Sequence, residues 1–144
     1  MKMGKAKRYD AFDGAPFSEK DSQETVKHMD LTNPQFGLKL SDSVVSIEIA
    51  EHIPSKYESI FLDNIFRHAK EGIILSWTVP GQDGLAHINN KTLRYDFRKI
   101  LENNFLVDMT SSNYLQDNCG FQHLKKNVYA YTKILDSNND ELRH

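Results

Sequence analysis

Blocks of apolar residues alternate with polar ones along the chain in a way that predicts strands and helices in turn. Runs rich in β-branched and aromatic residues, such as IILSWTV, are typical of strands covered on both faces. The predicted strands are Arg8–Phe12, Thr25–Met29, Asp42–Ile47, Ile73–Val79, Phe105–Met109 and Val128–Ile134. Two segments with apolar side chains at helical spacing, Pro54–Lys70 and Thr92–Asn103, lie between them. This order predicts a doubly wound α/β fold.

The helix over Pro54–Lys70 is expected to end near Gly72, since glycine often follows the last helical turn. Residues at helical spacing are expected to face the core: Tyr57, Ile60, Phe61, Ile65 and either His68 or Ala69 from the first helix, and Leu93, Phe97, Ile100 and Leu101 from the second. Trp77 is expected in the core rather than against a substrate. The remaining segments are predicted to be connectors or irregular: Ala15–Glu24 with at most one helical turn, Leu31–Leu40, Pro80–Asn90 and about Tyr114–Lys125.

Polar residues follow the run VVSI directly. Glu48 closes what is predicted to be a buried strand, and Glu51 and His52 come three residues later. Ligands of open α/β sheets bind beyond the carboxyl ends of the strands, so these side chains are candidates for a site. Simpler interpretations stay open. Glu48 could be an exposed strand end, while Glu51 and His52 could be residues just ahead of a helix, where negative charge is favoured.

Composition limits the classes of function. The 144 residues, 39% of them hydrophobic, suit one domain or part of one, with a core over about residues 8–134 and disordered ends. No long apolar run predicts a membrane span, and a net charge of -2 argues against a broad nucleic-acid surface. The single cysteine, Cys119, favours a reducing, cytoplasmic location. No metal site is expected, because HxxxH, CxxC and HExxH spacings are missing.

Three segments, DSVVSIEIAEHIP, YESIFLDNIFRHAKEG and IILSWTVPGQDGLAHINN, resemble the later two-thirds of class I S-adenosylmethionine-dependent methyltransferases. The resemblance runs from about Tyr9 to Lys133. It implies a Rossmann-like, mostly parallel sheet with an antiparallel C-terminal strand, lacking the family's first strand and helix. Residues 1–144 would then form a single partial methyltransferase domain that binds S-adenosyl-L-methionine.

The resemblance also implies a cofactor site. Asp13, with Gly14, resembles the acid that accepts hydrogen bonds from both ribose hydroxyls, and Asp30 resembles the acid that accepts from the adenine amine. Leu31 would pack on the adenine ring, and Glu48 would face the methionine part of the cofactor. Two alternatives stay open: Asp13-Gly14 could be only a turn, and Asp30 only a strand end before a helix-start signal.

For catalysis, the resemblance places Glu48 beside the methyl acceptor, with Glu51 and His52 on the rim. His87, together with Asn89 and Asn90, would approach from the next loop. Glu48 or His87 is the first candidate for a base, followed by Glu51 and His52. The histidine and both asparagines could equally be ordinary loop residues.

The chain departs from the family in one respect: no two of its glycines are one residue apart, so the GxGxG turn is missing. The strands ending at Asp13 and Glu48 either close up and pair directly, or the sequence is a truncated piece of a larger domain. The expected function is methyl transfer to an unidentified acceptor. The alternatives are a non-catalytic remnant that acts as a binding or regulatory module, and a nucleotide-binding oxidoreductase. The acceptor and oligomeric state are left open.

Overall fold

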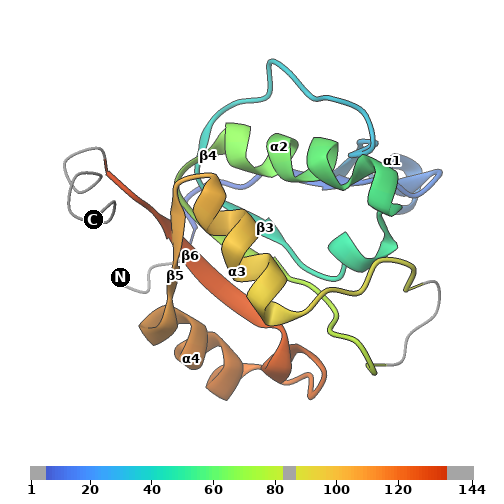
Figure 1. Cartoon of the computed structure of the whole chain (residues 1–144). Helices are drawn as coiled ribbons and strands as arrows, with labels where there is room; N and C mark the ends of the chain where they lie inside the picture. Colours follow the sequence, from blue (N-terminus) through green and yellow to red (C-terminus); the bar gives the residue numbers. More distant parts are fainter. Residues whose placement is uncertain (1–5, 83–86, 136–144) are drawn as a thin grey trace.

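The computed structural model describes residues 6–82 and 87–135, which form six strands and four α-helices (Figure 1). The predicted loop Pro80–Asn90 has no helix or strand in its described part, and its residues 83–86 lie outside the described residues. The strands are β1 (Ala11–Asp13), β2 (Val26–His28), β3 (Ser41–Ser46), β4 (Ala69–Ser76), β5 (Phe105–Asp108) and β6 (Val128–Lys133). The α-helices are α1 (Ser18–Asp21), α2 (Glu58–His68), α3 (Leu93–Glu102) and α4 (Met109–Asn118), and short 3-10 turns cover Ala50–His52, Ser55–Tyr57 and Leu124–Lys126.

The strands form two sheets. β1 and β2 pair in parallel as a small sheet, and the main sheet has the order β3-β4-β6-β5. β3 and β4 are parallel, whereas β6 is antiparallel to both β4 and β5. Three strands of the main sheet therefore run in one direction and only the C-terminal strand opposes them. This confirms the predicted α/β fold with an antiparallel last strand.

One face of the main sheet carries the core. Alternate residues of β4 point to opposite faces, and Ile73 and Leu75 pack with Phe61 of α2 and Ile100 of α3 in one buried cluster. Ile74 lies on the opposite face, where it borders an apolar hollow of about 310 Å³ together with Leu115 of α4. Helices thus lie on both faces of the sheet. Trp77, which follows β4, is 1% exposed, so its predicted place in the core is confirmed.

β3 is an edge strand, so its predicted burial is wrong. Val45 is 62% exposed, and of the strand's six residues only Ser46 is buried. Within the described residues, β3 pairs only with β4 and β1 only with β2. Direct pairing of the strands that end at Asp13 and Glu48, one of the two expected outcomes, is therefore not what forms.

Three local predictions are also wrong. Helix α2 ends at His68 and the chain continues directly into β4, so Gly72 lies inside a strand, where a Cβ atom would stand 3.2 Å from the carbonyl oxygen of Tyr131. The predicted irregular stretch begins inside α4, whose first turn is capped by the Asp108 carboxylate accepting from the Ser111 N–H at 3.0 Å. Leu101 of α3 is exposed rather than buried.

Candidate functional site

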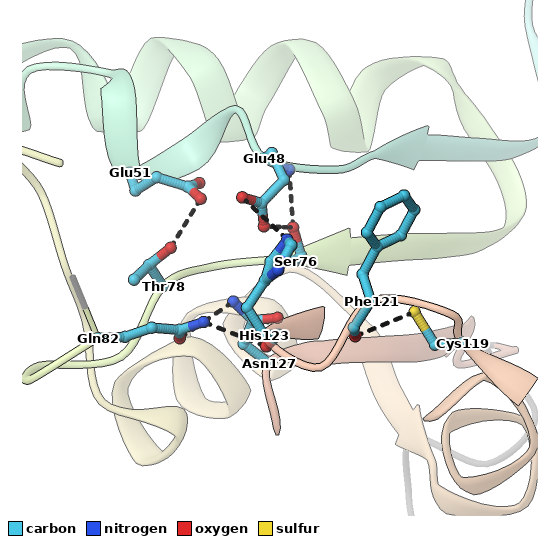
Figure 2. Close-up of polar contacts among 9 residues, drawn as sticks. All are labelled: Glu48, Glu51, Ser76, Thr78, Gln82, Cys119, Phe121, His123 and Asn127. Carbon is cyan, nitrogen blue, oxygen red and sulfur yellow. Dashed lines mark hydrogen bonds and ion pairs between the residues drawn. The ribbon is translucent and has the colours of Figure 1, made fainter. Parts of the chain in front are cut away.

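Glu48 lies just past β3 in a strained backbone conformation. Its φ of 57° is in the left-handed region, which costs a residue other than glycine about 1–3 kcal/mol. The Glu48 N–H donates to Ser76 Oγ at 2.8 Å, and His123 Nε2 lies 3.7 Å from Glu48 Oε2. Figure 2 shows the Glu48 carboxylate pointing toward Ser76 and the end of β4. Strain of this kind often marks functional sites, which fits the predicted role of Glu48.

Glu51 is fully buried in the 3-10 turn that follows. Its Oε1 accepts a hydrogen bond from Thr78 Oγ1 at 2.7 Å, as Figure 2 shows, while its Oε2 has no hydrogen-bond partner among the described residues. His52 is exposed, and its ring lies edge-on to that of His87, with ring centroids 5.1 Å apart. The structure thus brings Glu51, His52 and His87 together, although 35 positions separate His52 from His87.

Backbone hydrogen bonds fix the loop that carries His87. The N–H groups of Ile88 and Asn89 both donate to the Glu51 carbonyl oxygen, at 3.0 and 3.1 Å. The indole N–H of Trp77 donates to the Asn89 carbonyl oxygen at 2.7 Å. The loop is therefore attached to the turn at Glu51 and to the core at Trp77, which gives His87 a defined position.

Glu58, at the start of α2, is a buried centre of polar contacts, which the sequence pattern did not predict. Its Oε2 accepts from Asn89 Nδ2 at 3.0 Å and pairs with Lys91 Nζ at 3.2 Å, and its Oε1 accepts from the Tyr95 hydroxyl. Burial alone would raise the pKa of Glu58, but the bonds from Tyr95, Asn89 and Lys91 outweigh it and lower that pKa. Burial, followed by the bond to Glu58, raises the pKa of Tyr95 to about 12.

Replacing Glu58 with alanine is expected to destabilise the protein by about 2–3 kcal/mol, because Lys91, Asn89 and Tyr95 would lose their shared acceptor. Urea unfolding of wild type and Glu58→Ala measures the effect. Glu71→Ala, which removes an exposed glutamate from β4, is the matched control and should change the free energy of unfolding by less than about 0.5 kcal/mol. Equal losses of unfolding free energy in the two variants would contradict the role of Glu58 as a buried, shared acceptor.

Asp13 and Asp30 lie at the ends of the two parallel strands of the small sheet: Asp13 is the last residue of β1, and Asp30 comes two residues after β2. Asp13 is in register with His28, two residues before Asp30, and Asp13 Oδ1 accepts from the Ala15 N–H at 2.6 Å. Gly14 lies close to the second strand, since a Cβ atom there would stand 3.3 Å from the Met29 carbonyl oxygen. Both acids are exposed. The predicted strand ends and the tight turn at Asp13-Gly14 are therefore both present.

The Asp30 carboxylate accepts from the Thr32 N–H at 2.9 Å, from Thr32 Oγ1 at 2.6 Å and from Asn33 Nδ2 at 2.7 Å. The bonds from Thr32 are the main reason that the pKa of Asp30 lies below its ordinary value. This carboxylate is therefore an ionised acceptor at neutral pH. Leu31, beside it, is half-buried and packs against the core.

Asn64 of α2 ties the turn around Asp30 to the rest of the protein. Its Nδ2 donates to the carbonyl oxygens of Leu31 and Asn33 at 3.2 and 2.9 Å, and its Oδ1 accepts from the Gln35 N–H at 2.7 Å. The predicted site residues thus form two groups. Asp13, Gly14, Asp30 and Leu31 lie around the small sheet, whereas Glu48, Glu51, His52 and His87 lie around the ends of β3 and β4. The expectation that one ligand spans both groups stays a prediction.

Comparison with known proteins shows similarity in structure but not in sequence. No protein-family model and no curated protein matches the chain. Magnesium protoporphyrin IX methyltransferase from Synechocystis PCC 6803 with bound SAH superposes on 81% of this chain with a TM-score of 0.56 and 14% identity. The same enzyme with bound SAM gives a TM-score of 0.53 at 15% identity. An enzyme described as a pericyclic reaction enzyme covers 90% of this chain with a TM-score of 0.54 and 13% identity.

The chain spans just over half the length of the methyltransferase structures, 57% and 52% of those chains. Within the described residues, no helix has the length and apolar character needed to cross a membrane. The likeness shows the fold: the strands and helices of this chain have the Rossmann-like α/β arrangement seen in class I S-adenosylmethionine-dependent methyltransferases.

Proposed function

We propose that this chain is part of an S-adenosylmethionine-dependent methyltransferase that acts on an acceptor still to be identified. The observation that carries the proposal is a likeness in fold to an enzyme whose structures hold SAH and SAM. The predicted polar residues support it, because Asp13 ends β1 while Asp30 and Glu48 come two residues after β2 and β3, and ligands of open α/β sheets bind at such strand ends.

In this proposal Asp30 and Leu31 hold the adenine and Asp13 holds the ribose. Asp30 is suited to the role because its low pKa keeps it an acceptor, and an adenine amine offers only donors to it. Leu31 presents an apolar side chain anchored on the core. The close approach of Gly14 to Met29 fixes the turn beside the Asp13 carboxylate.

Glu48 would lie between the methionine part of the cofactor and the acceptor, with His87, Glu51 and His52 beside it. Methyl transfer moves CH₃ from the sulfonium sulfur to a nucleophilic atom and leaves S-adenosylhomocysteine. An acceptor hydroxyl or amine then loses a proton, which Glu48 or His87 would take. The protein contributes chiefly by holding the two reactants in line, an effect that can be worth about 7–11 kcal/mol.

Calorimetric titration of the 144-residue chain with S-adenosylhomocysteine tests the proposal. We expect binding with a dissociation constant in the micromolar range, and we expect Asp30→Ala to weaken it about tenfold, since a hydrogen bond to a charged group contributes about 1.5–3 kcal/mol. Asp42→Ala is the control. Asp42 is an exposed acid whose Oδ1 lies 3.8 Å from Lys70 Nζ. It is not one of the residues predicted to contact the cofactor, so its substitution should leave the dissociation constant unchanged.

No heat of binding at millimolar ligand, from protein shown to be folded by circular dichroism, would contradict the proposal. That result would instead favour a non-catalytic module with this fold. Equal weakening by Asp30→Ala and Asp42→Ala would keep cofactor binding but remove the role given to Asp30.

A further inference from the structure

We propose that Glu51, His52 and His87 bind one divalent transition-metal ion of the zinc type. Each residue offers one ligand atom, and these three atoms lie within 4.8 Å of one another. Ligands of a tetrahedral zinc ion at bonds of about 2.0–2.1 Å stand about 3.3 Å apart. Small rotations of three side chains therefore bring the atoms to coordinating positions.

The Glu51 carboxylate is the strongest indication of a metal site. It is fully buried, and of its two oxygens only Oε1 has a hydrogen bond, from Thr78 Oγ1. A buried carboxylate is costly unless it is paired, fully hydrogen-bonded or bound to a metal. Thr78 therefore acts as an outer partner that orients the carboxylate, and Oε2 is left to coordinate the ion.

His87 also has a buried polar atom, its Nδ1, without a hydrogen-bond partner among the described residues. Its ring lies at 73° to that of His52, so the two imidazoles meet edge to face rather than stacking. A metal ion would satisfy the buried nitrogen that the protein alone leaves unpaired.

The backbone segments that carry the three ligands are joined to each other before any metal binds. Two backbone N–H groups of the loop after His87 donate to the carbonyl oxygen of Glu51, so the loop and the turn cannot separate without breaking both bonds. Asn89 is held in addition by Glu58 and Trp77. Because the backbone of the site is already ordered, less of the metal-binding free energy is lost in ordering the ligands.

Two imidazoles and one carboxylate select the class of metal. Magnesium and calcium prefer oxygen ligands, whereas imidazole suits zinc and its transition-metal neighbours. Three protein ligands also leave one position of a tetrahedral ion open, as in catalytic rather than structural zinc sites. Sequence spacing predicted no metal because it detects ligands close together along the chain, and here 35 positions separate the two histidines.

Titration of the chelator-treated 144-residue chain with Zn²⁺ and with Co²⁺ tests the proposal. We expect one ion per chain by calorimetry, a visible Co²⁺ absorption spectrum of tetrahedral type, and no competition from millimolar Mg²⁺. His52→Ala, His87→Ala and Glu51→Gln should each weaken binding by at least about tenfold, since loss of an outer-shell partner already costs about 10–100-fold.

His28→Ala is the matched control, because His28 is an exposed histidine on β2, outside the cluster. It should leave the affinity unchanged. His52 is exposed, so His52→Ala should fold normally even if Glu51→Gln does not, and circular dichroism checks both. The proposal is overturned if wild type binds no more tightly than the His52→Ala/His87→Ala double variant, or if His28→Ala weakens binding equally.

The metal titration needs neither cofactor nor acceptor, so its outcome is separate from that of the methyltransferase proposal. Binding of S-adenosylhomocysteine without binding of zinc would overturn only the metal site. Binding of zinc without S-adenosylhomocysteine would overturn only the cofactor site. When zinc is held by His87, Glu48 is the remaining first candidate for the base of the proposed methyl transfer.

Discussion

Trp77→Ala is expected to lower the free energy of unfolding by about 3–5 kcal/mol, the range for truncating a large buried aromatic side chain. Trp77 is 1% exposed and meets Phe61 and Tyr95 edge to face, with ring centroids 6.4 and 6.3 Å away. The substitution also leaves the Asn89 carbonyl oxygen without the indole N–H. Denaturant unfolding followed by circular dichroism measures the loss.

Two further variants separate packing from hydrogen bonding. Trp77→Phe keeps an aromatic ring and loses the indole N–H, so it should cost less than Trp77→Ala. Leu106→Ala truncates a β5 residue that is 48% exposed, and it should cost less than about 1 kcal/mol. If Trp77→Ala were no more destabilising than Leu106→Ala, the assignment of Trp77 to the core would be wrong.

Asp96→Asn is expected to stabilise the protein at pH 7 by about 2 kcal/mol and to have little effect at pH 4. Asp96 is a buried acid on α3, and its Oδ1 has no hydrogen-bond partner among the described residues. Burial, followed by the negative charge of Glu58, raises the pKa of Asp96 to about 7. The shift corresponds to at most about 4 kcal/mol at pH 7, and part of it is lost because the amide also needs partners.

The free energy of unfolding changes with pH because the folded and unfolded states release the Asp96 proton at different pH values. Below about pH 4 the carboxyl is protonated in both states, and between pH 4 and 7 only the folded state keeps the proton. The folded state then binds more protons, so this group's contribution to stability falls as pH rises and levels off above pH 7. The difference in stability between wild type and Asp96→Asn should therefore widen from pH 4 to pH 7.

Glu102→Gln is the matched control, since Glu102 is an exposed acid on the same helix, 51% exposed in its side chain. Its difference from wild type should stay nearly constant over the same pH range. A constant difference for Asp96→Asn as well would show that Asp96 ionises as it does in the unfolded chain.

The order of the strands and of helices α2 and α3 could be predicted because most of these elements have a clear apolar pattern. Ile73 and Leu75 of β4 lie in the core with Phe61 and Ile65 of α2, as their spacing indicates. The pattern failed for α4, which has few apolar residues, although the Asp108 cap and Ser111 gave a readable start signal. It failed for the burial of β3 because apolar composition does not reveal whether a strand has one neighbour or two.

The polar core was harder to predict than the apolar one. Asp96 and Glu58 both fall at helical spacing with buried apolar residues, Asp96 with Ile100 and Glu58 with Phe61, yet charge suggests exposure. Their burial depends on partners brought from elsewhere in the fold, such as Lys91. The grouping of Glu51 with His87 likewise depends on the loop after β4 folding back onto the turn after β3.

The three hydrogen bonds of Asn64 give helix α2 an influence beyond the core it helps to build. They attach the turn that holds Asp30 to a helix whose other face packs on the main sheet. A small rotation of this helix would therefore also move the turn that carries the Asp30 carboxylate. Substitutions in the interior of α2 should then change the affinity measured for the proposed cofactor at Asp30, even though the replaced side chains lie away from that carboxylate.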